Sequence, residues 1–209
     1  MRLFTRTVHL TGPPAEIIAF STDMAGHVSA TTGVEVGLWN VQFGAPVGTI
    51  VYSARIEGLT ELESMTASLM ADTEYHALLA RGADFIAAPA EDALATPLHG
   101  GDGDVPPVGT VITSTRAVVA GGKYADAAAW GVDIAIHSEK VTGYPVGFYM
   151  DAFGTFGGVA WLSGAPDPGA AETAGDALNA DADYLTKLGD IGNLFLPGSG
   201  NRSLATRIA

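Results

Sequence analysis

An internal repeat is the feature of this sequence that most constrains its fold. Shifting the sequence by 110 positions pairs identical residues at 24 of 99 positions, whereas this composition alone gives about eight or nine matches. The matches cluster as Thr5-Arg6-x-Val8 with Thr115-Arg116-x-Val118, Asp23-x-Ala25-x-His27 with Asp133-x-Ala135-x-His137, and Thr32-Gly33-x-x-Val36-Gly37 with Thr142-Gly143-x-x-Val146-Gly147. The repeat predicts two copies of one folded unit.

A segment rich in glycine and proline separates the two copies. Residues 99–109 read HGGDGDVPPVG, a composition typical of a linker without a core of its own. We therefore predict a first unit over residues 1–98, a linker over 99–109 and a second unit over 110–209.

Within the first copy, the hydrophobic pattern predicts the element order βαββαβ. An alternating segment predicts a strand, apolar residues at helical spacing predict a helix, and glycine or proline marks the ends of both. The predicted elements are a strand over 2–10, a helix from Pro13-Pro14 to Thr32-Gly33, strands over 34–43 and 47–54, one helix over 59–80, a strand over 84–88 and a short extra strand over 91–97.

This element order is that of the ferredoxin-like split βαβ unit. Helices cover only one face of its sheet, so two units can bury their bare faces against each other. The predicted fold class is α+β, with two tandem ferredoxin-like βαββαβ units packed as an intramolecular, pseudo-dimeric α/β barrel.

The βαββαβ order, the duplication, the helix end at Thr32-Gly33 and the Tyr75-x-x-Leu78-Leu79 helix before Gly82 resemble the dimeric α/β barrel superfamily. That superfamily includes antibiotic-biosynthesis-type monooxygenases, NIPSNAP-like and EthD-like proteins, and the haem-binding chlorite dismutases. The resemblance spans nearly the whole chain, and no motif singles out one family. It implies a cavity between sheet and helices that holds a hydrophobic small molecule, but no particular reaction.

Composition narrows the classes of partner. The net charge of -13 disfavours nucleic acid and anionic membranes. Charged residues make up only 16% of the chain, which favours burial of surface in a homo-oligomer. The sequence has no cysteine, so disulfides and thiolate sites are excluded. Without a signal peptide or a transmembrane run, the chain is expected to be soluble and cytoplasmic.

The repeated Asp and His residues are the first candidate site. Asp23 with His27, and Asp133 with His137, stand four residues apart, which puts both side chains on one helix face. A carboxylate beside an imidazole raises its basicity, so these residues are candidate catalytic groups. The alternative is structural, because a histidine near a helix C-terminus is favoured by the macrodipole.

Arg6 and Arg116 are candidate ligand-binding residues, because a strand guanidinium can grip a carboxylate. Pairing with an acidic residue of the fold is the alternative. Aromatic residues in the predicted second and third strands, Trp39, Tyr149 and Trp161 among them, are candidates to line a ligand pocket. Core packing also explains them.

His76 is a candidate haem ligand only through the resemblance, since a helix histidine binds iron in the haem proteins of that superfamily. No haem-attachment motif accompanies it, and the sequence requires no cofactor, so the cofactor stays unknown with haem as one option. No metal site is predicted.

Three functions therefore remain open. The first is a small-molecule-binding protein, or a cofactor-independent oxygenase or isomerase, that uses an apolar cavity in the barrel. The second is a non-catalytic scaffold that forms a homo-oligomer. The third is a haem-binding protein.

Overall fold

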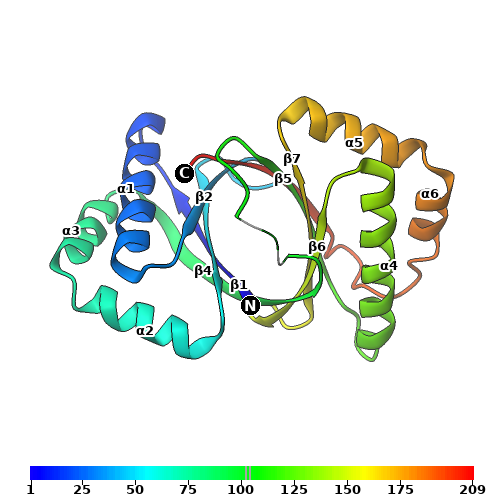
Figure 1. Ribbon diagram of the computed structural model, residues 1–209, viewed down its shortest axis with the longest axis horizontal. Helices are drawn as coiled ribbons and strands as arrows, with labels where there is room; N and C mark the ends of the chain where they lie inside the picture. Colours follow the sequence, from blue (N-terminus) through cyan, green and yellow to red (C-terminus); the bar gives the residue numbers. More distant parts are fainter. Residues whose placement is uncertain (102, 104) are drawn as a thin grey trace.

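A computed structural model of the chain describes all residues except Asp102 and Asp104. Both belong to the predicted linker, so this part of the linker prediction lies outside the described residues. Eight strands close into one barrel, and helices pack against its outer surface, α1 to α3 on one side and α4 to α6 on the other (Figure 1). The fold is a mixed α/β structure around an antiparallel barrel.

Both halves follow the same element order. The first half contains β1 (Arg2–Leu10), α1 (Pro14–Thr32), β2 (Val36–Phe43), β3 (Thr49–Ile56), α2 (Leu59–Met70), α3 (Thr73–Gly82) and β4 (Ile86–His99). The second half contains β5 (Val111–Val118), α4 (Tyr124–Thr142), β6 (Val146–Phe153), β7 (Gly158–Ala165), α5 (Pro168–Ala180), α6 (Ala182–Gly189) and β8 (Asn201–Arg207).

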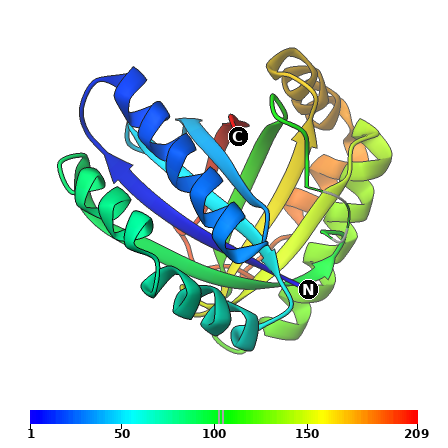
Figure 2. The same ribbon diagram turned by 60° about the vertical axis from the view of Figure 1, so that its left-hand side comes forward.

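The barrel closes because the edge strands of the halves pair with each other. Each half forms a four-stranded sheet, in the order β2-β3-β1-β4 or β6-β7-β5-β8. The long strand β4 pairs with β6, and β8 pairs with β2, in antiparallel ladders. The bare faces of the two sheets are therefore buried together, as the predicted pseudo-dimeric barrel implies. They line the inside of a barrel, which Figure 2 shows from a second side.

Two sequence predictions about the end of each unit are wrong in detail. The single helix predicted over 59–80 is two helices, α2 and α3, because Asp72 between them caps α3 with its carboxylate on the amides of Glu74 and Tyr75. The two strands predicted over 84–88 and 91–97 are one strand, β4, although Pro89 lies within it. A bulge in the β1–β4 ladder accommodates this part of the strand.

The predicted helix end at Thr32-Gly33 is confirmed. Gly33 and its repeat, Gly143, both adopt left-handed backbone with φ of 73° and 75°, which favours glycine after a helix. In the described part of the chain, no helix combines the length and the apolar character needed to cross a membrane.

The first half has a continuous core between its sheet and its helices. Leu38 and Ile50 of the sheet are almost fully buried, and Phe20, Met65 and Tyr75 of the three helices pack into the same cluster. The second half has a smaller buried cluster, centred on Phe148. Neither α5 nor α6 contributes a buried residue to it.

Gly131 of α4 provides a test of this packing. A Cβ on Gly131 would lie 2.2 Å from the Phe148 ring, which is fully buried. Gly131→Ala is expected to lower the free energy of unfolding by about 1–3 kcal/mol, because the ring has no space to move. Gly26→Ala in α1, where nothing lies within 4 Å, is expected to raise it by about 0.5–1 kcal/mol through helix propensity. Urea unfolding measures both, and equal effects would contradict this packing.

Candidate functional site

The repeated arginines do not occupy equivalent positions in the barrel. Arg6 lies opposite Asp92 in the β1–β4 ladder, whereas Thr115 lies opposite Arg202 in the β5–β8 ladder. The structural equivalent of Arg6 is therefore Thr115, one residue away from the Arg116 that the sequence repeat pairs with it. A shift of one residue turns a strand side chain to the other face, so Arg6 faces the helices and Arg116 faces the barrel interior.

Each arginine pairs with an acidic residue of the fold. Arg6 makes a bidentate contact with Asp92, at 2.8 and 2.7 Å, and this hydrogen bonding raises the pKa of Arg6. Arg116 donates to Asp151 at 3.3 Å. The Asp151 carboxyl is almost fully covered, and burial raises its pKa although Arg116 opposes the shift.

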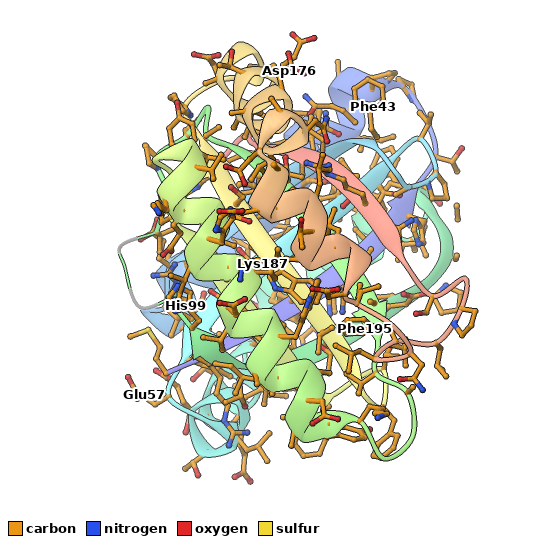
Figure 3. All side chains as sticks on the ribbon, turned by 90° about the vertical axis from the view of Figure 1, so that its right-hand side faces the viewer. Phe43, Glu57, His99, Asp176, Lys187 and Phe195 are labelled. Atoms are coloured by element: carbon orange, nitrogen blue, oxygen red, sulfur yellow. The ribbon has the colours of Figure 1, made fainter. Side chains whose placement is uncertain are left out.

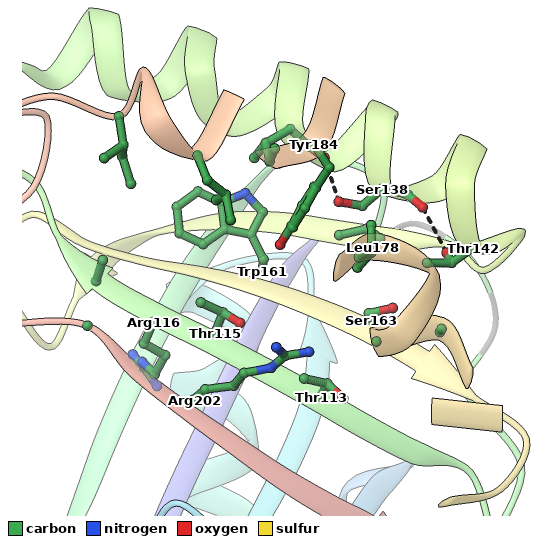
Figure 4. Close-up of a pocket in the computed structure, with 18 of the residues that line it drawn as sticks. Thr113, Thr115, Arg116, Ser138, Thr142, Trp161, Ser163, Leu178, Tyr184 and Arg202 are labelled. Atoms are coloured by element: carbon green, nitrogen blue, oxygen red, sulfur yellow. Dashed lines mark hydrogen bonds between the residues drawn. The ribbon is translucent and has the colours of Figure 1, made fainter. Parts of the chain in front are cut away.

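A cavity of about 280 Å³ lies in the second half, between the sheet and helices α4, α5 and α6. Its walls are apolar, with the aromatic rings of Trp130, Trp161 and Phe195 at one side. Trp130 and Phe195 meet Trp161 edge-on, at ring separations of 5.8 Å. The cavity therefore offers flat aromatic surface to a ligand. Figure 4 shows these walls from within.

The cavity exists because small residues replace large ones. Register and helix caps define equivalent positions in the two halves. From the first half to the second, the exchanges are Phe4 to Thr113, Arg6 to Thr115, Val8 to Ala117, Leu62 to Ala171 and Met65 to Ala174. The second half thus has smaller side chains than the first on both the sheet and the α5 side of this space. The volume that the larger side chains fill in the first half is the cavity in the second.

A few polar groups interrupt the apolar lining. Tyr184 extends from α6 with its hydroxyl toward the sheet, and Arg202 lies along the sheet near Thr113 and Thr115 (Figure 4). Ser163 adds a further hydroxyl from β7. These groups can accept from or donate to a bound molecule, and Arg202 can hold an anion.

A second cavity, of about 590 Å³, opens into the barrel interior and is lined from both halves. Thr5, Thr7 and Glu91 of the first half face Arg116 and Val118 of the second across it. Its lining is far more polar than that of the first cavity, and the one guanidinium in it is already paired with Asp151. It is therefore the weaker candidate for an apolar ligand.

The repeated Asp and His residues hold the broken second helices in place. The contacts expected from the sequence, Asp23 with His27 and Asp133 with His137, do not form. His27 meets Asp72 at 3.0 Å and His137 meets Asp181 at 2.8 Å, the residues that cap α3 and α6. The reason is that the capping carboxylates lie over the same face of α1 or α4 and are fixed there by backbone amides.

The aspartates of these pairs bind the other end of the same short helices. Asp23 accepts from Arg81 at 2.6 Å, and Asp133 pairs with Lys187, which Figure 3 shows on α6 beside α4. None of the four repeated residues lines either cavity described above. Their contacts give them a structural role, and their catalytic role stays a prediction.

Trp39 and Tyr149 lie at equivalent positions with their rings inside the barrel, because their strand neighbours Leu38 and Phe148 face the helices. Trp39 donates its indole N–H to Ser53 Oγ at 2.8 Å, and Tyr149 packs closely over Gly101 and Gly147. Both are buried, and neither lines the aromatic-walled cavity.

His76 is exposed on α3, where its Nε2 lies 3.0 Å from the Met70 carbonyl oxygen. It is in the first half, away from the cavity of the second. Among the described residues, no group of three histidine, cysteine or carboxylate side chains could hold a metal ion.

Sequence reasoning missed three of the residues that define the cavity: Trp130, Tyr184 and Arg202. Trp161, one of the aromatic strand residues that it named as candidates, does line the cavity. The sequence contained a signal for Arg202. The 110-residue shift aligns it with Asp92, so the charge at this position differs in sign between the two repeats. The signal for the cavity was the loss of large apolar residues in the second copy. This loss is seen only when the strands are aligned in their structural register. The sequence alignment pairs β1 with β5 one residue away from that register.

Comparison with solved structures identifies the fold. The structure of a candidate monooxygenase from Fusobacterium nucleatum subsp. nucleatum is similar over 100% of this chain and 92% of its own, with a TM-score of 0.72 and 11% identity. An anthrone oxidase-like protein is similar over 100% and 92%, with a TM-score of 0.67 and 13% identity. A candidate chlorite dismutase covers 100% and 96%, with a TM-score of 0.55 and 10% identity.

No model of a known protein family matches the sequence, and no curated protein is similar to it in sequence. The fold is that of the dimeric α/β barrel superfamily, as the sequence resemblance predicted. Identities this low are informative about fold alone.

The anchoring role of Asp181 is testable through pH. Hydrogen bonds from His137 and from the Tyr184 amide lower the pKa of Asp181 below its ordinary value of 3.8. A lowered pKa in the folded state stabilises the fold above the ordinary pKa, and the gain is lost as pH falls through the lowered value. Asp181→Asn, which keeps a capping oxygen but no charge, is therefore expected to unfold at lower urea than the wild type at pH 6, and the difference is expected to shrink below pH 3.8.

Asp176→Asn is the matched control, because Asp176 is exposed near the end of α5 (Figure 3). It is expected to leave the urea midpoint unchanged at pH 6. If Asp181→Asn and Asp176→Asn had the same urea midpoint at every pH, the Asp181 carboxylate would not stabilise the fold.

Proposed function

We propose that this protein binds an apolar small molecule in the cavity between the second-half sheet and helices α4 to α6. The observation that carries the proposal is the cavity itself, an apolar space of about 280 Å³ with aromatic walls and a few convergent polar groups. Ligand sites have this combination of features. Since neither α5 nor α6 has a buried residue, we expect the ligand to enter past these two helices.

An oxygenase-type reaction on that molecule is the activity we propose. It is supported by the likeness of the fold to a candidate monooxygenase and an anthrone oxidase-like protein. In this reading Tyr184 and Ser163 are the groups that orient the ligand in the cavity. Arg6, Arg116, Trp39 and Tyr149 are then residues of the scaffold.

We also propose that the two halves are diverged copies of one ferredoxin-like unit. The shared element order and sheet order support this, together with the sequence repeat. The first copy has kept a filled core, and the second has become the binding half. One site per chain is therefore expected, in place of the two symmetric sites that repeated catalytic residues would give.

The haem ligand that the resemblance suggested does not fit the site. His76 is exposed and lies in the half without the aromatic-walled cavity. The described lining of that cavity has no histidine, cysteine or methionine, and among side chains that bind haem iron it offers tyrosine, as Tyr144 and Tyr184.

A homo-oligomer is the second candidate, and a specific observation favours it. Phe43 and Phe153, equivalent residues at the ends of β2 and β6, are 70% and 57% exposed, and Phe156 is 89% exposed. Large exposed apolar side chains near hairpin turns are costly on a free surface. Self-association through these turns is compatible with ligand binding, because none of the three residues lines the cavity.

Filling the cavity tests the proposed function. Ala174→Met installs the residue that the first half carries at this helix position, Met65. It is expected to weaken binding of anthrone, a flat apolar probe, at least about tenfold, since the side chain occupies ligand space. Isothermal titration calorimetry measures the affinity, and oxygen uptake with anthrone measures turnover.

Ala180→Met is the control, on an exposed turn of the same helix, and is expected to bind as the wild type does. Wild-type protein that bound no flat apolar probe, or Ala174→Met protein that bound as well as the control, would refute the cavity as the site.

A further inference from the structure

The cavity of the second half has an electrostatic character opposite to that of the whole chain. The protein carries 23 acidic and 10 basic residues, yet the described lining of this cavity contains no aspartate or glutamate. Two arginines are among its lining residues, but the Arg116 side chain is on the barrel-interior face of the sheet, where it pairs with Asp151. The remaining positive charge is that of Arg202.

Arg202 occupies the place of an acidic residue in the other half. In the first half, the cross-strand pair is Arg6 with Asp92, and the two side chains neutralise each other. In the second half, the same pair is Thr115 with Arg202. The arginine is therefore absent from β5, the equivalent of β1, and an arginine is present on the neighbouring strand β8. The residue opposite it, Thr115, has a neutral hydroxyl group.

Within the part of the chain that the structure describes, the Arg202 guanidinium has no ion pair and no side-chain hydrogen bond. The repeated strand arginines, Arg6 and Arg116, are by contrast both paired with aspartates. Its side chain lies along the floor of the cavity, near the hydroxyls of Thr113 and Thr115 (Figure 4). Arg202 is exposed to solvent, so its unpaired guanidinium is accessible to an anion, and charge-assisted hydrogen bonds to a guanidinium are stronger than neutral ones.

We propose that the ligand of this cavity is an organic carboxylate with a flat apolar body, its carboxylate paired with Arg202 and its body against Trp130 and Trp161. The planar fork of a guanidinium matches the two oxygens of a carboxylate. The threonine hydroxyls are placed to donate to the remaining lone pairs. This inference rests on the proposed function and names the chemical class that the same site selects.

Two probes of the same shape separate charge from apolar burial. 2-Naphthoate carries a carboxylate, and 2-naphthamide is its neutral counterpart. Wild-type protein is expected to bind the carboxylate about 10–100-fold more tightly than the amide, since a hydrogen-bonded charge pair contributes that much to affinity. Arg202→Gln is expected to remove this preference while it leaves the affinity for the amide within about threefold. Isothermal titration calorimetry at constant ionic strength measures all four affinities.

Lys140→Gln is the matched control, because it removes one positive charge from an exposed position of α4 outside the cavity. It is expected to keep the full preference for the carboxylate, and Arg202→Lys is expected to keep part of it. Equal binding of both probes by the wild type, or an unchanged preference in Arg202→Gln, would overturn the carboxylate while the proposed cavity function stands. Binding of neither probe by folded wild-type protein would overturn the proposed function and this inference with it.

Discussion

The structure depends on two pairs of edge strands that hydrogen bond between the halves, β4 with β6 and β8 with β2. A four-stranded sheet with helices on one face has two open edges and one bare face, both of which are unfavourable in water. Pairing β4 with β6 and β8 with β2 removes the edges and turns the bare faces inward in one step. A single chain thereby forms a closed barrel by itself. Its C-terminal residues take part, because Ile208 and Ala209 hydrogen bond with Leu38 of β2.

Within this symmetric frame the two halves have diverged in how they fill the space under their helices. The first half packs Phe4, Leu62 and Met65 into a continuous core. The second half has threonine or alanine at the same places and keeps an open, aromatic-walled cavity. A cavity costs stability in proportion to its volume. The barrel thus joins one half with a filled core to one half with a cavity, and the filled half is the one without this loss of stability.

The same His–carboxylate contact secures the helices in both halves. His27 and His137 bind the residues that begin α3 and α6, and Asp23 and Asp133 bind cations further along those helices. In the second half this anchoring also positions part of the cavity, since α6 carries Tyr184 into its wall. The repeated residues thus affect the cavity through the position of α6, without lining it.

The sequence by itself determined most of the order of elements and the helix end at Gly33, because these follow from local periodicity and backbone preference. It also placed the resemblance to the superfamily correctly. Only the tertiary structure decided which faces the strand residues take, because a one-residue offset of β5 reverses Arg116 relative to Arg6 without changing the local pattern. It likewise decided that His27 meets Asp72, 45 residues away, in preference to its neighbour Asp23. The tertiary structure also decided the cavity and the unpaired state of Arg202. Both depend on how side chains from distant segments of the chain fill space and pair their charges.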